Sequence, residues 1–178
     1  MGNKKHYIVT AITLGLIAAS SAGLIGLANL ITRDRIAQNE IDKVNAGIKE
    51  IFGDNASIFE EKTQKEAGFA GDYKYLSSYY IVNNGDDAAG IAFRTNGSNM
   101  YGKISLLIGY SGATHNLMGF TVVVNEQTYA TTLEENYIVP VNEGKRDYED
   151  VSCGATYGAK LIRDMVNEAE QAANEIWN

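Results

Sequence analysis

The chain begins with a long apolar segment. Residues 7–31 include no charged side chain, and Lys4 and Lys5 stand just before them. A helix needs roughly 20 apolar residues to cross the hydrocarbon core of a bilayer. The segment therefore predicts a transmembrane anchor over residues 7–32, preceded by a short stub at residues 1–6. A cleaved signal peptide is the alternative, because small residues stand in the middle of the segment.

A second helical pattern follows the anchor. In residues 33–55, apolar side chains recur at near-helical spacing until Gly53, a residue that commonly ends a helix. This pattern predicts a juxtamembrane helix. Positive charges nearly balance across the anchor, but the amino-terminal stub has no acidic residue, which favours a cytoplasmic amino terminus. We therefore expect a single-pass protein of the cell membrane with the bulk of the chain outside the cytoplasm. The apolar positions of the second helix are Ile36, Ile41, Val44, Ile48 and Ile51.

The pattern changes to short β-rich segments after residue 74. Residues 75–82 and 88–95 are separated by "NNGDD", and an Asn-Gly pair between two such runs predicts a hairpin. Residues 103–110 and 117–124 form a second pair around "SGATHN". The chain then returns to helical spacing near its end, with apolar residues on one face at Ile162, Met165, Val166, Ala169, Ala173 and Ile176. These elements predict an α+β fold, with a compact β-rich domain over residues 56–178 that finishes in a carboxy-terminal helix.

Composition excludes several functions. The net charge of the 178-residue chain is -7, and no basic patch is evident, so nucleic acid is not an expected partner. One cysteine and two histidines do not provide the ligands of a zinc site or an iron–sulfur cluster. Redox chemistry in this chain would therefore have to come from an organic cofactor.

Two sites end in Gly-Ala-Thr. The first, at residues 111–114, lies between two predicted strands, and its small residues suit a turn. The second, "DVSCGATYG", begins at Asp150 and leads into the carboxy-terminal helix. A phosphate on Thr156 would lie at the first turn of that helix, where unpaired N–H groups and the helix dipole favour negative charge. Gly154 and Ala155 leave room for a bulky group. The alternative is that Thr156 simply caps the helix.

The second site resembles the signature Asp-x-x-(Ser/Thr)-Gly-Ala-Thr of the FMN-binding domain family. That domain is found in the G subunit of the Rnf ion-translocating electron transport complex and in the C subunit of the sodium-translocating NADH:quinone reductase. The sequence of anchor, juxtamembrane helix, β-rich middle, motif and terminal helix is similar to the Rnf G subunit over nearly the whole chain. The matching residues are Asp150, Cys153, Gly154, Ala155 and Thr156, with Cys153 in the Ser/Thr position.

The resemblance implies a function for Thr156. In that family a flavin transferase joins FMN through its phosphate to the final threonine as a phosphoester. The chain would then be an electron-transfer subunit, not catalytic alone, in a complex that couples electron flow between ferredoxin and NAD to ion translocation. Its partners would be the other Rnf subunits. The first Gly-Ala-Thr site does not match, because Ile108 stands where the signature has Asp.

An upstream segment departs from the family pattern. The family usually has Glu-Thr-Pro-Gly-Leu-Gly in a loop near the flavin, and the corresponding region here is "NEQTYATTLEEN". Gln127 and Thr128 correspond to the Glu-Thr pair, but residues 129–132 include neither the proline nor the glycines. Tyr129 and Tyr157 are candidates for packing against the flavin ring.

Two other functions remain open from the sequence. The chain could be a stand-alone, membrane-anchored flavoprotein that passes electrons to extracellular acceptors. It could also be an extracytoplasmic binding domain without redox activity, in which Gly-Ala-Thr only starts a helix. The second alternative predicts a colourless protein even in the presence of a flavin transferase.

Overall fold

The computed structural model describes the backbone of residues 2–85 and 87–177. Within α1 (Gly2–Phe52) the side chains of residues 2–5, 28, 30, 31, 33, 34, 36 and 37 are not described, so Ile36 of the predicted apolar positions lies outside the described side chains. The side chain of residue 87 is not described either. The chain divides into two compact units, residues 1–42 and residues 43–178, and each is described by itself.

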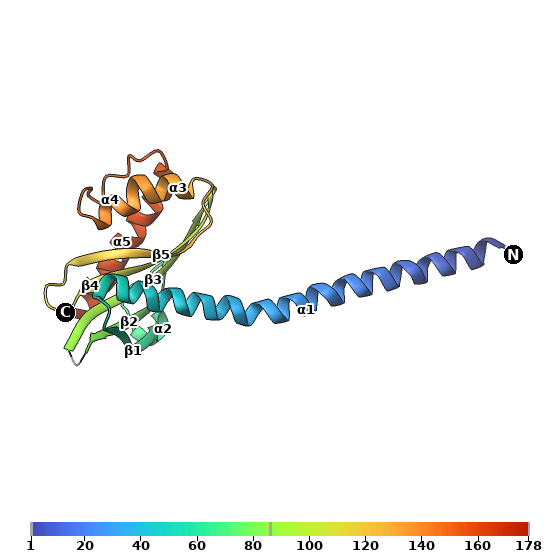
Figure 1. The fold of residues 1–178 in the computed structure, drawn as a ribbon, viewed down its shortest axis with the longest axis horizontal. Coiled ribbons are helices and arrows are strands. Elements are labelled where there is room, and N and C mark those ends of the chain that lie inside the picture. Colours follow the sequence, from blue (N-terminus) through green and yellow to red (C-terminus); the bar gives the residue numbers. More distant parts are fainter. Residues whose placement is uncertain (1, 86, 178) are drawn as a thin grey trace. The chain divides into compact units, whose positions relative to one another are not determined.

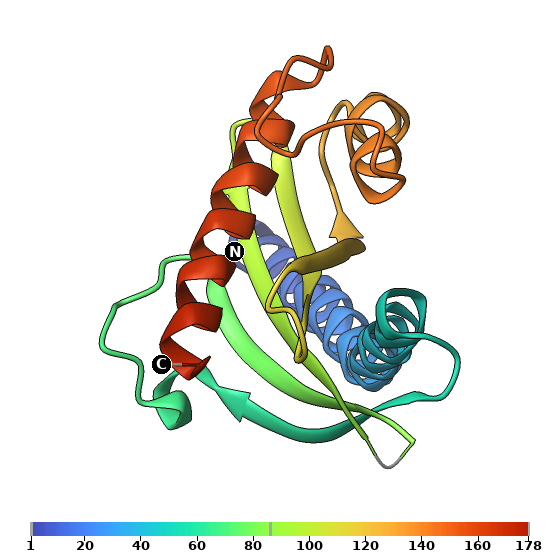
Figure 2. The same cartoon turned by 90° about the vertical axis from the view of Figure 1, so that its left-hand side faces the viewer.

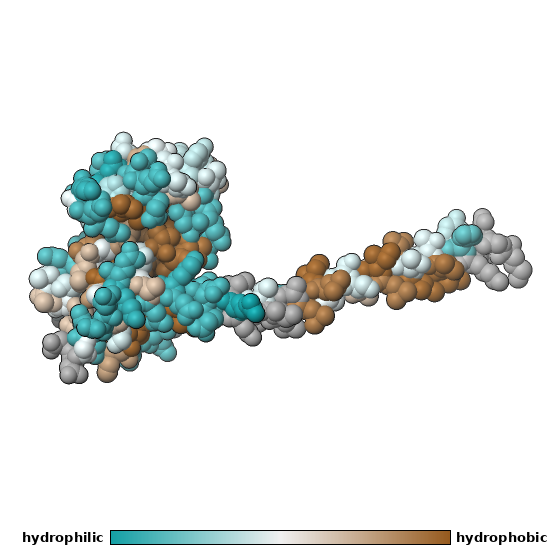
Figure 3. Space-filling view, viewed as in Figure 1, coloured by the Kyte–Doolittle hydropathy of each residue, from teal (hydrophilic) through white to brown (hydrophobic). Residues whose placement is uncertain are grey.

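The described part of the first unit, residues 2–42, belongs to α1. The stretch His6–Leu27 is 22 residues long and apolar enough to cross a membrane. At a rise of 1.5 Å per residue it spans about 33 Å, which matches a hydrocarbon core of about 30 Å. Its apolar side chains are exposed along the helix, where Figure 3 shows them in brown. The end of α1 belongs to the second unit, and Gly53 follows it with a φ of 103°.

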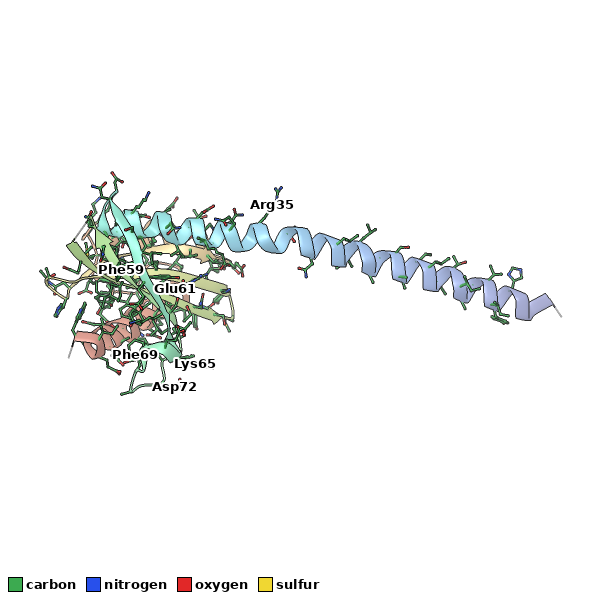
Figure 4. The ribbon with its side chains drawn as sticks, turned by 90° about the horizontal axis from the view of Figure 1, so that it is seen from below. Arg35, Phe59, Glu61, Lys65, Phe69 and Asp72 are labelled. Atoms are coloured by element: carbon green, nitrogen blue, oxygen red, sulfur yellow. The ribbon has the colours of Figure 1, made fainter. Side chains whose placement is uncertain are left out.

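The second unit is built on a five-stranded antiparallel sheet in the order β1-β2-β3-β4-β5 (Figure 1). Both predicted hairpins are present, and each strand pairs with its sequence neighbour. The sequence pattern does not predict β1. A bulge between Ile58 and Glu60 interrupts its alternation, and Phe59 (labelled in Figure 4) is 71 % exposed, so the strand does not show a period of two. The strands are β1 (Ala56–Thr63), β2 (Leu76–Asn84), β3 (Asp87–Asn99), β4 (Gly102–Ser111) and β5 (Leu117–Asn125).

A helix covers each face of the sheet, as Figure 2 shows for α5 (red) and the end of α1 (teal). Val44, Ile48 and Phe52 of α1 pack on one face, against residues such as Leu107. The other face packs against α5 (Thr156–Trp177), which is the predicted carboxy-terminal helix. Because both faces are covered, every residue of β4 from position 104 to 110 is buried, and this explains its almost continuous apolar run.

The buried face of α5 is wider than its periodicity suggests. Four positions of the helix besides the predicted ones are buried, and Ile176, one of the predicted positions, is only partly buried. The Tyr110 hydroxyl on β4 donates to the Val166 carbonyl at 3.0 Å and links the sheet to the middle of the helix. The additional buried residues are Gly158, Ala159, Leu161 and Ala172.

Two carboxylates of α5 hold the segment at residues 70–76, which follows α2 (Gln64–Ala67). Glu168 accepts from two backbone N–H groups of this segment at 2.5 and 2.9 Å. Glu175 accepts from the Tyr73 hydroxyl and from the Ala70 backbone N–H. These bonds connect the carboxy-terminal half of α5 to the connection between α2 and β2.

The Tyr73 bond predicts a loss of stability in alkali. Burial, together with the hydrogen bond to Glu175, raises the pKa of Tyr73 to about 12. The ordinary phenol pKa is about 10, so the stabilisation is complete below about pH 10 and disappears as the pH rises through about 12. We expect the melting temperature of Tyr73→Phe to fall less than that of the wild type over this interval. Melting temperatures are measured by circular dichroism. If they fall equally with pH in Tyr73→Phe and the wild type, the stabilisation does not come from the Tyr73 hydroxyl.

Candidate functional site

A pocket with an empty volume of about 330 Å³ lies where three segments meet. One wall comes from the turn between β3 and β4, one from the segment after β5, and one from the start of α5. Figure 1 shows α3 (Ala130–Leu133) and α4 (Val139–Asn142) beside the start of α5. The pocket is lined by Tyr101, Gln127, Tyr129, Leu133 and residues 154–158.

Asp150 organises the loop that leads to the pocket. Its Oδ1 accepts from the Ser152 backbone N–H at 3.1 Å, which closes a local turn. The Arg146 guanidinium donates to the carbonyl oxygens of Asp150 at 3.4 Å and Ser152 at 3.2 Å, and it lies 3.7 Å from Asp150 Oδ2. Asp150 is exposed and does not line the pocket. The carboxylate therefore shapes the loop and does not contact whatever occupies the pocket.

Cys153 and Gly154 turn the chain from the core toward the pocket. The Cys153 side chain is 7 % exposed and packs in the main core as a free thiol. Its carbonyl accepts from the Asn136 side-chain amide at 3.4 Å. Gly154 has a φ of 83°, a left-handed conformation that residues with a Cβ rarely adopt. Cys153, in the Ser/Thr position of the signature, thus anchors the loop in the core. The chain then reverses direction at Gly154, in a conformation that favours glycine.

Thr156 begins α5 and does not cap it. The Ala155 carbonyl accepts from the backbone N–H groups of Gly158 at 2.9 Å and Ala159 at 3.1 Å, so Ala155 occupies the cap position. The interpretation of Thr156 as an N-cap is therefore wrong. Within residues 2–85 and 87–177, neither the Thr156 hydroxyl nor its backbone N–H has a hydrogen-bond partner. A partly exposed hydroxyl with no partner, at the amino terminus of a 22-residue helix, is available to a ligand.

Three tyrosines line the same pocket as Thr156. The Tyr101 ring centroid lies 5.8 Å from that of Tyr129 and 5.5 Å from that of Tyr157, with interplanar angles of 62° and 46°. Tyr129 is 53 % exposed and Tyr157 is 59 % exposed. The sequence marks both of these residues as candidates, and the structure places both at the pocket. It does not mark Tyr101, because nothing in its local sequence distinguishes it from a tyrosine in an ordinary turn.

Of the pair Gln127 and Thr128, only Gln127 lines the pocket. Its Nε2 donates to the Gly102 carbonyl, which can only accept, and this orients the amide. Gln127 is 7 % exposed, and its Oε1 has no hydrogen-bond partner among the residues that the structure describes. Thr128 is exposed, and its hydroxyl donates to the Tyr101 carbonyl at 3.2 Å. Thr128 therefore holds Tyr101 and does not face the pocket.

The segment that lacks the expected proline and glycines forms the start of a helix. α3 continues directly into the π-helical turn η1 (Glu134–Ile138) and then into α4. Tyr129 precedes the first turn of α3, and Leu133 ends it. Side chains from this helical turn thus form the wall for which the family pattern predicts a glycine-rich loop.

The first Gly-Ala-Thr site is a hairpin turn, as expected. It joins β4 to β5, and Ser111 Oγ accepts from the backbone N–H groups of Ala113 and Thr114 at 3.3 Å each. His115 has a φ of 59°, and its ring stacks on Trp177 with centroids 4.0 Å apart. Thr114 is exposed and is not among the residues of the tyrosine-lined pocket.

Comparison with known proteins supports the resemblance to the Rnf G subunit. Residues 1–51 match the family described as the RnfG N-terminal region. Over 130 residues, or 70 % of this chain, it is 28 % identical to the G subunit of the ion-translocating oxidoreductase complex of Shewanella piezotolerans. That match spans about 60 % of the relative's length. The chain is thus similar to RnfG proteins in both its helical amino-terminal region and much of the remainder.

Proposed function

We propose that this chain is the G-type subunit of an ion-translocating oxidoreductase complex and that it carries FMN covalently on Thr156. The observation that carries the proposal is the unpartnered Thr156 hydroxyl, which lies at a helix amino terminus and beside an aromatic-lined pocket. The similarity to the G subunit of the Shewanella complex supports the assignment to such a complex. His6–Leu27 would anchor the protein in the membrane, and residues from about 33 onward would lie outside the cytoplasm.

The residues at the pocket fit the parts of FMN. The unpaired N–H groups at the start of α5 suit a phosphate on Thr156, because the helix dipole favours negative charge there. Gly154 has no side chain, and a Cβ at its position would lie 3.5 Å from the Thr132 methyl group, so glycine leaves more room for a bulky group here than a larger residue would. The three tyrosines offer aromatic surface for the isoalloxazine ring, and Gln127 Oε1, on a residue that is 7 % exposed, offers an unpartnered acceptor within the described part of the chain.

A covalent bond is expected on energetic grounds. Attraction of a phosphate to an exposed helix terminus contributes about 0.3–1 kcal/mol, and stacking of a ring on an aromatic side chain contributes about 1–3 kcal/mol by analogy with nucleic-acid bases. Their sum reaches only about millimolar affinity, for which about 4 kcal/mol is needed. A cofactor held so weakly outside the cytoplasm would be lost by dilution, and a phosphoester prevents that loss.

The chain's own residues would hold and orient the cofactor. When bound, FMN supplies one- and two-electron transfer, which suits a relay between other carriers of the complex. Asp150 and Arg146 shape the loop that a flavin transferase would read, and buried Cys153 anchors it in the core. The Oγ1–phosphorus bond would form as a phosphorus–oxygen bond of an activated flavin phosphate donor breaks, so the donor phosphate loses its leaving group and Thr156 loses its hydroxyl proton. The chain therefore gains the mass of FMN less one water.

The proposal can be tested on the full-length chain expressed with an exported flavin transferase. We expect a yellow protein with this added mass after purification in detergent, whose flavin fluorescence persists in a denaturing gel. Affinity purification from the native membrane should also recover the integral-membrane subunits of the complex. A flavin adduct without those subunits would favour the stand-alone carrier, and a colourless chain would favour the non-redox binding domain.

Arg146 provides a test of the loop. Removing its guanidinium in Arg146→Ala deletes hydrogen bonds to two carbonyls, and such charged bonds contribute about 1.5–3 kcal/mol. We expect flavin attachment by a purified transferase to slow by roughly ten-fold or more, because about 1.4 kcal/mol corresponds to a factor of ten. In-gel fluorescence against time measures this rate. The neighbouring Lys145→Ala, which removes a cation that is 70 % exposed, should leave the rate unchanged.

A further inference from the structure

The turn between β3 and β4 is fastened to both other walls of the pocket. Asn99 Oδ1 accepts from the Tyr101 backbone N–H at 2.8 Å, and Asn99 Nδ2 donates to the Tyr157 carbonyl in the first turn of α5 at 3.1 Å. On the other side, the Thr128 backbone N–H and hydroxyl donate to the Tyr101 carbonyl at 2.9 and 3.2 Å. The backbone of Tyr101 is therefore positioned relative to both the start of α5 and the segment after β5.

Tyr101 is also the central ring of the three. It contacts both Tyr129 and Tyr157, whereas no ring contact joins those two among the described residues. Both partners meet Tyr101 at steep angles, so neither covers its face in a parallel stack. Tyr129 and Tyr157 are more than half exposed, whereas Tyr101 is only partly exposed. Of the three rings, Tyr101 is therefore the one that its neighbours hold most firmly in place, and its face is available to a ligand.

The polar groups around this ring suit a planar heteroaromatic ligand. The hydroxyls of Tyr129 and Tyr157 have no hydrogen-bond partner within the described part of the chain, and the same holds for that of Tyr101. Gln127 Oε1, on a residue more than nine-tenths buried, is likewise unpartnered and lies at the same pocket. A ligand ring that carries both hydrogen-bond donors and acceptors would match these groups, and an apolar ring would leave them unpaired.

We propose that Tyr101 packs against the isoalloxazine ring of FMN held at Thr156, and that Asn99 and Thr128 are positioning residues that orient Tyr101. This inference rests on the proposed function for the identity of the ligand. It adds a residue that the flavin signature does not include, from a turn distant in sequence from that signature. Tyr101 would here provide ring contact on the side where the segment after β5 has no glycine-rich loop.

The test compares full-length variants loaded with flavin by the transferase, at equal flavin per chain determined by intact mass. A phenol ring in contact with flavin quenches its fluorescence, because the excited ring accepts an electron from the phenol and then returns it. We expect Tyr101→Ala to increase flavin fluorescence several-fold and to reduce the visible circular dichroism of the flavin. Asn99→Ala should produce a smaller change of the same sign. Equal spectra for Tyr101→Ala and the wild type would overturn the inference.

Tyr101→Phe separates ring packing from a merely structural role. A phenyl ring retains the packing but does not donate an electron readily, so fluorescence should rise while the visible circular dichroism stays near that of the wild type. If Tyr101→Ala does not fold, this variant decides the question, and unchanged fluorescence in Tyr101→Phe overturns the inference. Phe59→Ala is the matched control, because it removes an aromatic ring on β1 that is 71 % exposed and does not line the pocket.

Failure of the proposed function has a different signature. If the wild type gains no flavin mass, the covalent assignment to Thr156 fails, and free riboflavin is then titrated into the purified chain. Saturable quenching of riboflavin that is lost in Tyr101→Ala would support the ring contact without the phosphoester. Absence of quenching in the wild type would overturn it.

Discussion

Replacing Thr156 with alanine is expected to abolish flavin attachment under conditions that load the wild type fully. The Oγ1 atom is the only part of the residue that can form the phosphoester, so the loss should be complete. Alanine favours helix, and the Thr156 hydroxyl has no partner within residues 2–85 and 87–177, so the variant should fold normally. Intact mass and in-gel flavin fluorescence measure the outcome, and circular dichroism confirms the fold.

Thr114→Ala is the matched control for this prediction. Thr114 ends the same Ser-Gly-Ala-Thr sequence as the family signature, but it lies in the β4–β5 hairpin turn and not at a helix start. Its alanine variant should carry as much flavin as the wild type, and Thr156→Ser should retain part of the loading because it keeps a hydroxyl. An adduct that persists in Thr156→Ala or disappears in Thr114→Ala would refute the assignment.

Gly102→Ala is expected to be strongly destabilising. Gly102 has a φ of 136°, and a Cβ at this position would lie 2.1 Å from the Glu126 carbonyl oxygen. The backbone strain costs about 1–3 kcal/mol and the displacement of packed atoms about 1–3 kcal/mol, so we expect a loss of roughly 2–6 kcal/mol. Such a loss is a large part of the roughly 5–15 kcal/mol that is typical of a folded domain. Denaturant unfolding of the purified chain measures it.

The same substitution should also affect the pocket. The Gly102 carbonyl accepts from Gln127, and its neighbour Tyr101 forms one wall, so a displaced turn alters two of the three walls together. Gly144→Ala is the control, since Gly144 has a φ of 68° but open space at its Cβ position, and its substitution costs only about 1–2 kcal/mol. If the two variants lower the free energy of unfolding equally, the close contact with Glu126 does not cause the additional destabilisation expected for Gly102→Ala.

Much of the fold is predictable because its signals are local. The uncharged run of α1, the Asn-Gly hairpin and the helical spacing of α5 each depend on residues close together in the chain. The reason that β1 is not predicted is also local, because the bulge after Ile58 shifts the alternation of inward and outward side chains by one position. The start of α5 at Thr156 and the helix that replaces the glycine-rich loop depend instead on how the chain packs around Cys153 and Leu133.

The candidate site shows the same division. The sequence alone indicated the candidate loop, because Asp150, Cys153, Gly154 and Thr156 lie within seven consecutive residues, and the turn at Asp150 and the chain reversal at Gly154 are local geometry. Only the tertiary structure brought Tyr101 to that loop, through a hydrogen bond from Asn99 to Tyr157 that joins residues 58 positions apart. Such contacts depend on strand register and on the packing of α5 against the sheet. Register and packing are properties of the whole core, so the residue pattern of a single segment does not predict them.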